Sequence, residues 1–276
     1  MSYSKKPLRL TLRFSLAVVL ALSASSLSFG AELCTGYGPQ SPRDISSLEG
    51  INARIFTPAP PSAEMNLCNI HLHRNAEHKG PGFSKFAGSE VHGGYQCNDT
   101  GTLTENEMLN PNTTDLHFKG VAPNDTIEVH WVFSSCDVSL GAGLDACSSE
   151  TCLNPELRVE TQVFLVANDS GDSMLDYGYG YNSAGGTIIN GYHQPKALPS
   201  NTGTPVIYTG STTGPSFTEA ACSPFQVTWS VRPQCAKVKL DSVLRWGASD
   251  DTIFDEDETH GVRQLVTAPE LLSKIE

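Results

Sequence analysis

The stretch Asn69-Ile70-His71-Leu72-His73-Arg74-Asn75-Ala76-Glu77-His78 decides the fold and the chemistry expected of this chain. Side chains of a β-strand alternate between its two faces, so a strand through this stretch directs His71 and His73 to the same side. A third histidine, His130, lies within Thr126–Phe133, where β-branched and aromatic residues predict another strand. If the two strands pair, three imidazoles converge on one metal ion.

The residues around these histidines favour a metal site over the simpler interpretation. A histidine in a strand is usually a satisfied polar group or a surface residue, and a His-x-His pair alone is weak evidence. Here Asn69 lies two residues before His71, and Glu128 lies two residues before His130. Each can bond the outer ring nitrogen of its histidine, as the partners of metal-binding histidines nearly always do. Zinc held by three histidines keeps a fourth position for water, which is typical of catalytic sites.

Residues 1–30 have the features of a secretory signal peptide. Four basic residues, the last of them Arg13, precede an apolar core from Phe14 to Leu22, and small residues around Gly30 form a cleavage zone. The apolar core is too short for a stable membrane anchor. We therefore expect an exported, soluble mature domain at 31–276 that is periplasmic or secreted and has no anchor after cleavage.

The cysteine count agrees with export. All eight cysteines follow the cleavage zone, and an even number in an exported chain predicts up to four disulfides. Cys147 and Cys152 are separated by four residues and have no matching second pair, so the spacing is unlike that of a zinc ribbon. Spacing alone leaves the disulfide pairing open.

Charge excludes nucleic acid as an expected partner. The signal peptide removes four of the 18 basic residues and no acidic residue, which leaves 14 basic against 30 acidic residues and a net charge of −16. Such a surface repels phosphate backbones. The mature chain is long enough to bury one large core, so we expect a single domain.

The remaining pattern predicts a mainly β domain, an α+β fold with few short helices. We expect one large, mostly antiparallel, twisted sheet stabilised by disulfides. Gly80–Thr113 is a long irregular excursion, Ala122–Asp125 is a turn, and the acidic run Asp255–Glu258 is a solvated loop. Helical periodicity is convincing only at Pro269–Ile275. Beyond the two histidine segments, strands are expected at Leu116–Val121, Leu157–Val166, Val206–Tyr208, Phe225–Val231 and Lys237–Trp246.

These segments resemble carbonic anhydrases. The delta class joins a His-x-His-x-Asn-Ala-Glu-His segment to a later Glu-x-His strand, as His71–His78 and Glu128–His130 do here. Three further segments are similar to the alpha class: Gln40–Ile45, Tyr208–Pro215 and Cys222–Val231. The motifs follow the family's order from residue 40 to 231, and only the two histidine segments are specific by themselves.

The resemblance implies an alpha-class-like fold and reversible hydration of carbon dioxide to bicarbonate and a proton by a zinc-bound hydroxide. Cobalt or cadmium are possible substitutes for zinc. It also implies a Cys34–Cys222 disulfide. The implied roles are metal ligands (His71, His73, His130), support of those ligands (Asn69, Glu128, His78), orientation of the hydroxide (Thr213, Glu77) and the substrate pocket (Val132, Thr212, Val227, Trp229).

The chain also departs from the alpha class. The interval between His73 and His130 is much longer, so the excursion at 80–113 has no counterpart there. The residues after Ser211 read Thr-Thr-Gly rather than Leu-Thr-Thr, which leaves open whether Thr212 or Thr213 orients the hydroxide. No histidine precedes His71 where a proton relay is expected; His92, His117, His193 and His260 are the remaining candidates.

Two other functions compete. His71, His73 and Glu77 also fit a first cupin motif, in which Glu77 becomes a ligand together with His130. Against a cupin, the second cupin motif does not occur around His130. A non-catalytic exported binding protein that kept the carbonic anhydrase fold is the second alternative.

Overall fold

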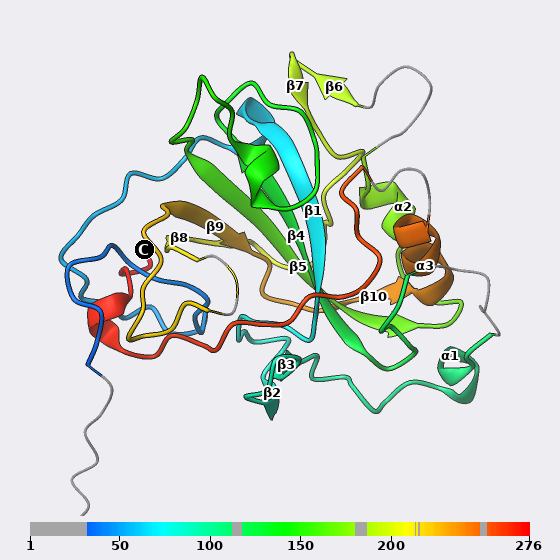
Figure 1. The fold of residues 1–276 in the computed structure, drawn as a ribbon. Coiled ribbons are helices and arrows are strands. Elements are labelled where there is room, and N and C mark those ends of the chain that lie inside the picture. The colour runs from blue at the N-terminus through cyan, green and yellow to red at the C-terminus, as the bar shows by residue number, and fades with distance from the viewer. Residues whose placement is uncertain (1–31, 112–117, 180–186, 213, 215, 249–252) are drawn as a thin grey trace, which may run out of the picture. The chain divides into compact units, whose positions relative to one another are not determined.

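The computed structural model describes residues 32–111, 118–179, 187–212, 214, 216–248 and 253–276. Its centre is a six-stranded sheet in which β1, β4, β5, β9 and β8 lie side by side in that order, and β10 also pairs with β5 (Figure 1). The strands are β1 (Asn66–Arg74), β4 (Thr126–Ser134), β5 (Leu157–Ala167), β8 (Val206–Thr209), β9 (Val227–Val231) and β10 (Ala236–Lys239).

Antiparallel pairings dominate the sheet, and they join β1 to β4, β4 to β5, and β8 to β9. Both β9 and β10 pair with β5 in parallel. They follow one edge of β5 in the same direction, with β9 along residues 157–161 and β10 along 164–167. Pro233 lies between them and has no N–H for a ladder bond. The expected mainly β fold with a mostly antiparallel sheet and few short helices is confirmed.

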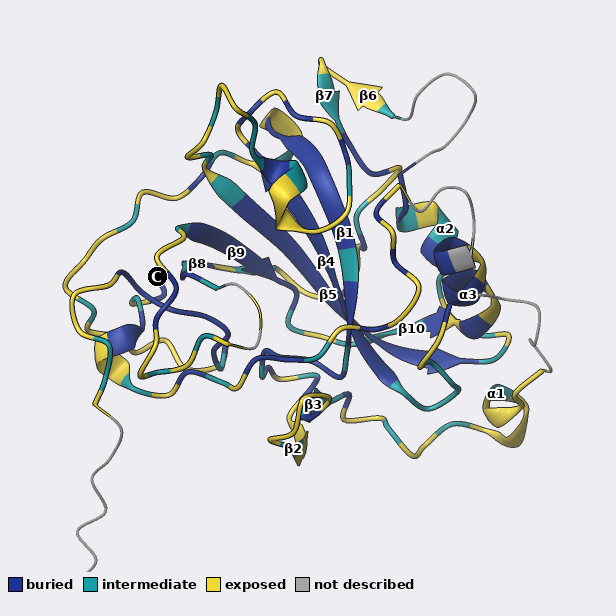
Figure 2. Ribbon diagram, viewed as in Figure 1, coloured by how far each residue is buried: buried dark blue, intermediate teal, exposed yellow. Residues whose placement is uncertain are grey.

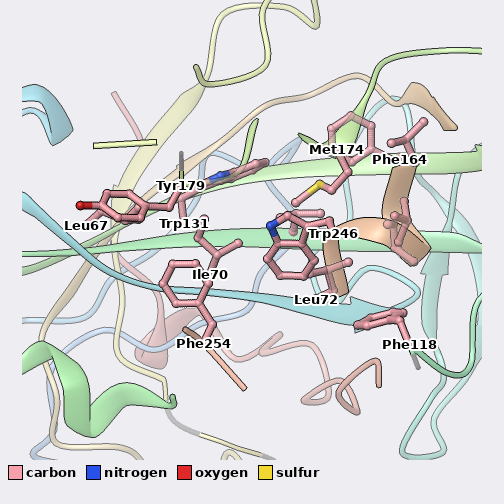
Figure 3. Packing of buried hydrophobic residues seen from close by; sticks show 14 of the residues in the cluster. Leu67, Ile70, Leu72, Phe118, Trp131, Phe164, Met174, Tyr179, Trp246 and Phe254 are labelled. Atoms are coloured by element: carbon pink, nitrogen blue, oxygen red, sulfur yellow. The ribbon is translucent and has the colours of Figure 1, made fainter. Parts of the chain in front are cut away.

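Both faces of the central strands are buried (Figure 2). On one face, Ile70, Trp131 and Phe164 pack with Met174 and Trp246 from two helices that lie beside each other, α2 (Met174–Tyr177) and α3 (Leu240–Ala248) (Figure 3). The other face carries a second apolar cluster around Val132, Val163 and Trp229. His130 alternates with Trp131 along β4 and therefore belongs to this second face.

The other elements are short. They are η1 (Ser62–Glu64), β2 (Lys85–Gly88), β3 (Gly94–Gln96), α1 (Glu105–Met108), η2 (Leu144–Cys147), β6 (Ile188–Ile189), β7 (Tyr192–His193) and η3 (Pro269–Leu271). None of the described helices in the chain has the length and apolar character needed to cross a bilayer.

Two strand predictions were wrong in part. The strand expected at Lys237–Trp246 ends at Lys239, and α3 follows, because Leu240, Val243 and Leu244 have the spacing of one helical face and are all buried. The strand expected at Leu116–Val121 is not formed in its described part, where Lys119 makes only an isolated bridge with Glu258. Leu116 and His117 lie outside the described residues.

The C-terminal part also differs from expectation. The helix expected at Pro269–Ile275 is only the 3-10 turn η3, because the chain becomes extended at Leu272 and the Ile275 amide donates to the carbonyl of Leu48. The acidic run Asp255–Glu258 is not wholly solvated, since Glu256 is buried and its carboxylate lies 3.0 Å from His260.

Four disulfides pair all eight cysteines, as the count predicts, and three of them join segments 79 to 188 residues apart in sequence. The bridge implied by the resemblance joins Cys34 to Cys222. It connects the N-terminal arm, residues 32–45, to the segment before β9. The other pairs are Cys68–Cys147, Cys97–Cys235 and Cys136–Cys152. Closing such long loops restricts the unfolded chain and stabilises the domain.

The excursion at 80–113 forms the β2–β3 hairpin and α1, whose first turn has a capping box between Thr104 and Glu107. Glu107 also accepts bonds from Lys237 Nζ on β10 at 2.5 Å and from the Ser170 hydroxyl at 2.7 Å. These bonds, with that from Lys237 first in importance, lower the pKa of Glu107 to about 2. The carboxylate therefore fastens α1 to the edge of the sheet.

Replacing Glu107 with Gln tests this attachment. A carboxyl whose pKa is lower in the folded than in the unfolded chain stabilises folding above its unfolded pKa of roughly 4.3. That stability is lost as the pH falls toward 2. We expect Glu107→Gln to lower the urea midpoint at pH 7, and the difference from the wild type to shrink between about pH 4.3 and pH 2. Glu105→Gln, on the exposed side of the same helix, is the control, and equal effects of the two changes would contradict the attachment.

Candidate metal centre

Strand register brings the three histidines together. His71 on β1 lies directly opposite His130 on β4, and His73 lies opposite Glu128. Directly opposite residues of an antiparallel pair project to the same face. The three imidazole centroids are 4.7 to 5.1 Å apart, and the three residues offer ligand atoms within 4.8 Å of one another. The predicted pairing of the two strands is thus observed.

Hydrogen bonds at the outer nitrogens leave the inner ones free. His71 Nδ1 donates to Asn69 Oδ1 at 2.6 Å, as the offset of two residues predicts. His73 Nδ1 donates to the carbonyl oxygen of Gly261 at 2.8 Å. In both rings the lone pair is therefore on Nε2. Such bonds fix the tautomer and orientation that a metal ligand needs.

His130 presents its other nitrogen. Its Nδ1 lies 3.2 Å from Nε2 of His71. Two ligands that are each about 2.0–2.1 Å from a tetrahedral zinc ion are roughly 3.3–3.4 Å apart, so this spacing fits a shared ion. His130 Nε2 is buried without a hydrogen bond, since Glu128 Oε2 is 3.6 Å away. That separation is too long for a good hydrogen bond from His130 to Glu128.

Two of the three histidines, His71 and His73, are electrically neutral at neutral pH. Burial places the pKa of His71 well below its usual value, and the nearby His130 and His73 add to this effect. Burial likewise lowers the pKa of His73 to about 4, although the charge of Glu77 acts in the opposite direction. Neutral imidazoles are the form that binds metal. His71 and His73 are therefore ready to bind a divalent ion without prior loss of protons.

Glu128 belongs to a buried hydrogen-bonded network. Its Oε1 accepts from His78 Nδ1 at 2.8 Å, and its Oε2 accepts from the Glu77 backbone N–H at 2.7 Å. His78 Nε2 contacts the Tyr208 hydroxyl at 2.8 Å, which lies 2.7 Å from the hydroxyl of Ser41. Burial acts to raise the pKa of Glu128, but His78 and His130 outweigh it and lower the pKa well below its usual value. The Glu128 carboxylate therefore connects β4 to residues 77 and 78, which follow β1.

A cavity of about 70 Å³ adjoins the three histidines. All four of the predicted pocket residues line it: Val132, Thr212, Val227 and Trp229. Glu77 also lines this cavity and is buried. Further apolar lining that the sequence did not reveal comes from Leu144, Leu157 and Val159. Thr213, expected to orient the hydroxide, lies outside the described residues.

Glu77, the ligand in the cupin alternative, also belongs to a second compact group. Glu77, His78, Glu128 and His130 offer ligand atoms within 4.8 Å of one another. Both nitrogens of His78 contact hydrogen-bonding partners, and Glu128 Oε2 accepts from the Glu77 amide. These groups largely satisfy one another, whereas the inner nitrogens of the three-histidine group face one another.

Sequence reasoning did not identify the roles of Gly261 and Arg263, which follow His260. The Gly261 carbonyl orients His73, and Arg263 lines the cavity. A backbone carbonyl has no sequence signature, so only the nearby His260 was singled out, as a candidate for proton relay. The ring of His260 lies 5.5 Å from that of His71, and its Nε2 contacts Glu256.

Two of the other relay candidates, His92 and His193, do not lie at the site. His193 Nδ1 contacts the Tyr179 hydroxyl at 2.8 Å, and His92 is exposed. Neither of them lines the cavity. His117 lies outside the described residues.

Comparison with protein families agrees with this arrangement. The family model described as delta carbonic anhydrase matches residues 62–242, which include both histidine strands and most of the cavity lining. The chain belongs to the delta carbonic anhydrase family. The resemblance drawn from the histidine segments is therefore confirmed. No match was found among the curated proteins.

Two solved structures are similar to this carbonic anhydrase family member at low identity. One is a hyperthermostable carbonic anhydrase identified from an active hydrothermal vent chimney, with 13% identity, 86% of each chain covered and a TM-score of 0.34. The other is the alpha-carbonic anhydrase of Thermovibrio ammonificans in complex with the inhibitor sulfanilamide. It has 15% identity, coverage of 80% of this chain and 83% of that chain, and a TM-score of 0.30.

The bond between Asn69 and His71 allows a test of the metal centre. Asn69→Ala removes the acceptor that fixes the His71 ring, so zinc affinity should fall roughly 10- to 100-fold. Competition with a chromogenic chelator measures this change. Asn66→Ala, on the same strand but bonded to the Cys136 carbonyl instead of a ligand, is the matched control. Unchanged zinc affinity in the Asn69 variant would argue against this orientation of His71.

Proposed function

We propose that this chain is an exported zinc enzyme that interconverts carbon dioxide with bicarbonate and a proton. The observation that carries the proposal is the convergence of three imidazoles, with His71 Nε2 and His130 Nδ1 3.2 Å apart, beside a small cavity with an apolar wall. Membership of the delta carbonic anhydrase family supports the substrate. Carbon dioxide is apolar and small, and a cavity of about 70 Å³ suits it.

His71, His73 and His130 would hold the ion. A divalent ion bound by three neutral histidines supplies water whose pKa is lowered to about 7, a value taken from carbonic anhydrases themselves. Zinc fits the nitrogen donor set, and cobalt or cadmium would also be accommodated. Asn69 and the Gly261 carbonyl hold two of the rings in the required tautomer, while Glu128 and His78 fix the strand segments that carry the ligands.

The other residues would position the reactants. Val132, Val227 and Trp229 keep carbon dioxide against an apolar wall, and Thr212 completes the pocket. An ionised Glu77 only accepts hydrogen bonds, so a threonine hydroxyl that donates to it must accept from the nucleophile. That arrangement directs the nucleophile's lone pair to the substrate. We assign this hydroxyl to Thr213.

Export is part of the proposal. Residues 1–30 would act as the signal peptide and 31–276 as the mature catalytic domain, in the periplasm or outside the cell. Four disulfides support an oxidising compartment. A cupin-type enzyme that uses Glu77 as a fourth ligand, and a carbonic anhydrase-like binding protein without turnover, remain the alternatives to be tested.

Carbon dioxide hydration followed by stopped-flow is the primary test. The zinc-loaded protein should catalyse hydration, and His71→Ala combined with His130→Ala should abolish both bound zinc and activity, because two of three ligands are lost. His92→Ala, at an exposed histidine that does not line the cavity, should leave both unchanged. Hydration retained in the double variant would exclude the three-histidine mechanism. A zinc-loaded wild type without hydration would favour the binding-protein alternative.

Glu77→Gln separates the carbonic anhydrase from the cupin. If Glu77 orients reactants, the variant should keep one zinc per chain and lose roughly 10²-fold in kcat/KM, the scale expected for misplaced reacting groups. If Glu77 is a ligand, the metal content should fall with the activity. Metal analysis of the purified variant beside its hydration rate distinguishes these outcomes.

A further inference from the structure

The segment that contacts the metal centre from outside the matched region begins at His260. Its backbone pairs with the edge of β1: the His260 amide donates to the Leu72 carbonyl at 2.7 Å, and the Arg74 amide donates to the His260 carbonyl at 3.0 Å. This pairing places the Gly261 carbonyl 2.8 Å from His73 Nδ1. The family match ends at residue 242, so it assigns nothing to this segment.

Arg263 lies two residues after Gly261 and contacts Glu77. The Arg263 backbone N–H donates to Glu77 Oε2 at 3.3 Å. The Arg263 side chain lines the same cavity as Glu77, and the residue is only 3% exposed. Burial lowers the pKa of Arg263, while the charge of Glu77 favours its protonated form. A buried cation therefore accompanies the carboxylate at the base of the cavity.

The guanidinium group of Arg263 also holds both ends of the segment that carries the threonines. Its Nη1 donates to the Ser211 carbonyl at 3.2 Å and lies 3.4 Å from Thr212 Oγ1. Its Nε donates to the Phe217 carbonyl at 2.6 Å. Nη1 also contacts the Ser41 carbonyl of the N-terminal arm. Only a planar group with several donors in a fixed fork reaches such separated acceptors at once.

From these contacts we propose that Arg263 is a positioning residue of the reaction. It joins Glu77, through its backbone, to Ser211, Thr212 and Phe217, through its side chain. Because Glu77 and Thr212 come from parts of the chain distant in sequence and both contact Arg263, their separation depends on this common anchor. The proposal rests on the proposed hydration function and adds to it the residue that fixes the direction of attack.

The test compares two changes at Arg263 with a matched control. Arg263→Met removes the guanidinium, and Arg263→Lys keeps a cation that cannot serve Ser211 and Phe217 together. Arg232→Met is the control, since Arg232 is similarly buried and donates to the Pro199 and Thr161 carbonyls, but does not line the cavity. Five quantities are measured for each zinc-loaded protein: bound zinc, the urea midpoint, kcat for hydration, KM for hydration, and amide hydrogen exchange of peptides that cover 211–217.

We expect Arg263→Met to retain zinc and lose about 10²-fold in kcat/KM, and Arg263→Lys to lose at least about tenfold. Exchange of residues 211–217 should be faster in both. Arg232→Met should lower the urea midpoint but keep kcat/KM within about twofold. A kcat/KM near that of the wild type in zinc-loaded Arg263→Met would overturn the proposal. If Arg263→Met does not fold, wild-type kcat/KM in Arg263→Lys overturns it instead.

Failure of the proposed function has a different signature. A zinc-loaded wild type that does not hydrate carbon dioxide removes the enzyme whatever the variants do. In that case, hydrogen exchange still tests whether Arg263 restrains the segment 211–217. Faster exchange at 211–217 in the Arg263 variants, but not in Arg232→Met, supports this restraint, and unchanged exchange refutes it.

Discussion

The register between β1 and β4 is the constraint on which the metal centre depends. His71 and His130 face each other across this pair, and their nitrogens meet at 3.2 Å. A slip by one residue would turn His71 and His73 to the face occupied by Ile70 and Trp131. Burial of large apolar side chains on that opposite face makes such a slip costly. The packing around Trp131 and Phe164, on the face of the sheet opposite the histidines, thus fixes the ligand geometry (Figure 3).

Burial shapes the chemistry as well as the geometry. It keeps His71 and His73 neutral, which is the form of imidazole that binds metal. It also requires that polar groups find partners, and the chain of contacts from Ser41 through Tyr208 and His78 to Glu128 meets this requirement. His130 Nε2 has no hydrogen bond beyond the distant Glu128.

The sequence predicted those features that depend on local periodicity. Alternation in β1 and β4 was enough to place His71, His73 and His130 on one face, and the offset of two residues identified Asn69. The expected bond from Glu128 to His130 was incomplete because His78 and the Glu77 amide compete for the same carboxylate. The contribution of Gly261 depends on a carbonyl 188 residues from its partner, which no local pattern reveals. At α3, a short alternating run at Lys237 concealed the helical spacing that begins at Leu240.

β1 is an edge strand of the central sheet, and the pairing with His260 covers its outer side next to the ligands. An uncovered edge offers unpaired amides and carbonyls to other chains. During synthesis, β1 and β4 emerge long before the residues that complete them. A nascent or truncated chain that ends before residue 260 consequently exposes the unpaired edge of β1 and lacks the Gly261 carbonyl that bonds His73. The orientation of His73 is therefore complete only once residues 260 and 261 have paired with β1.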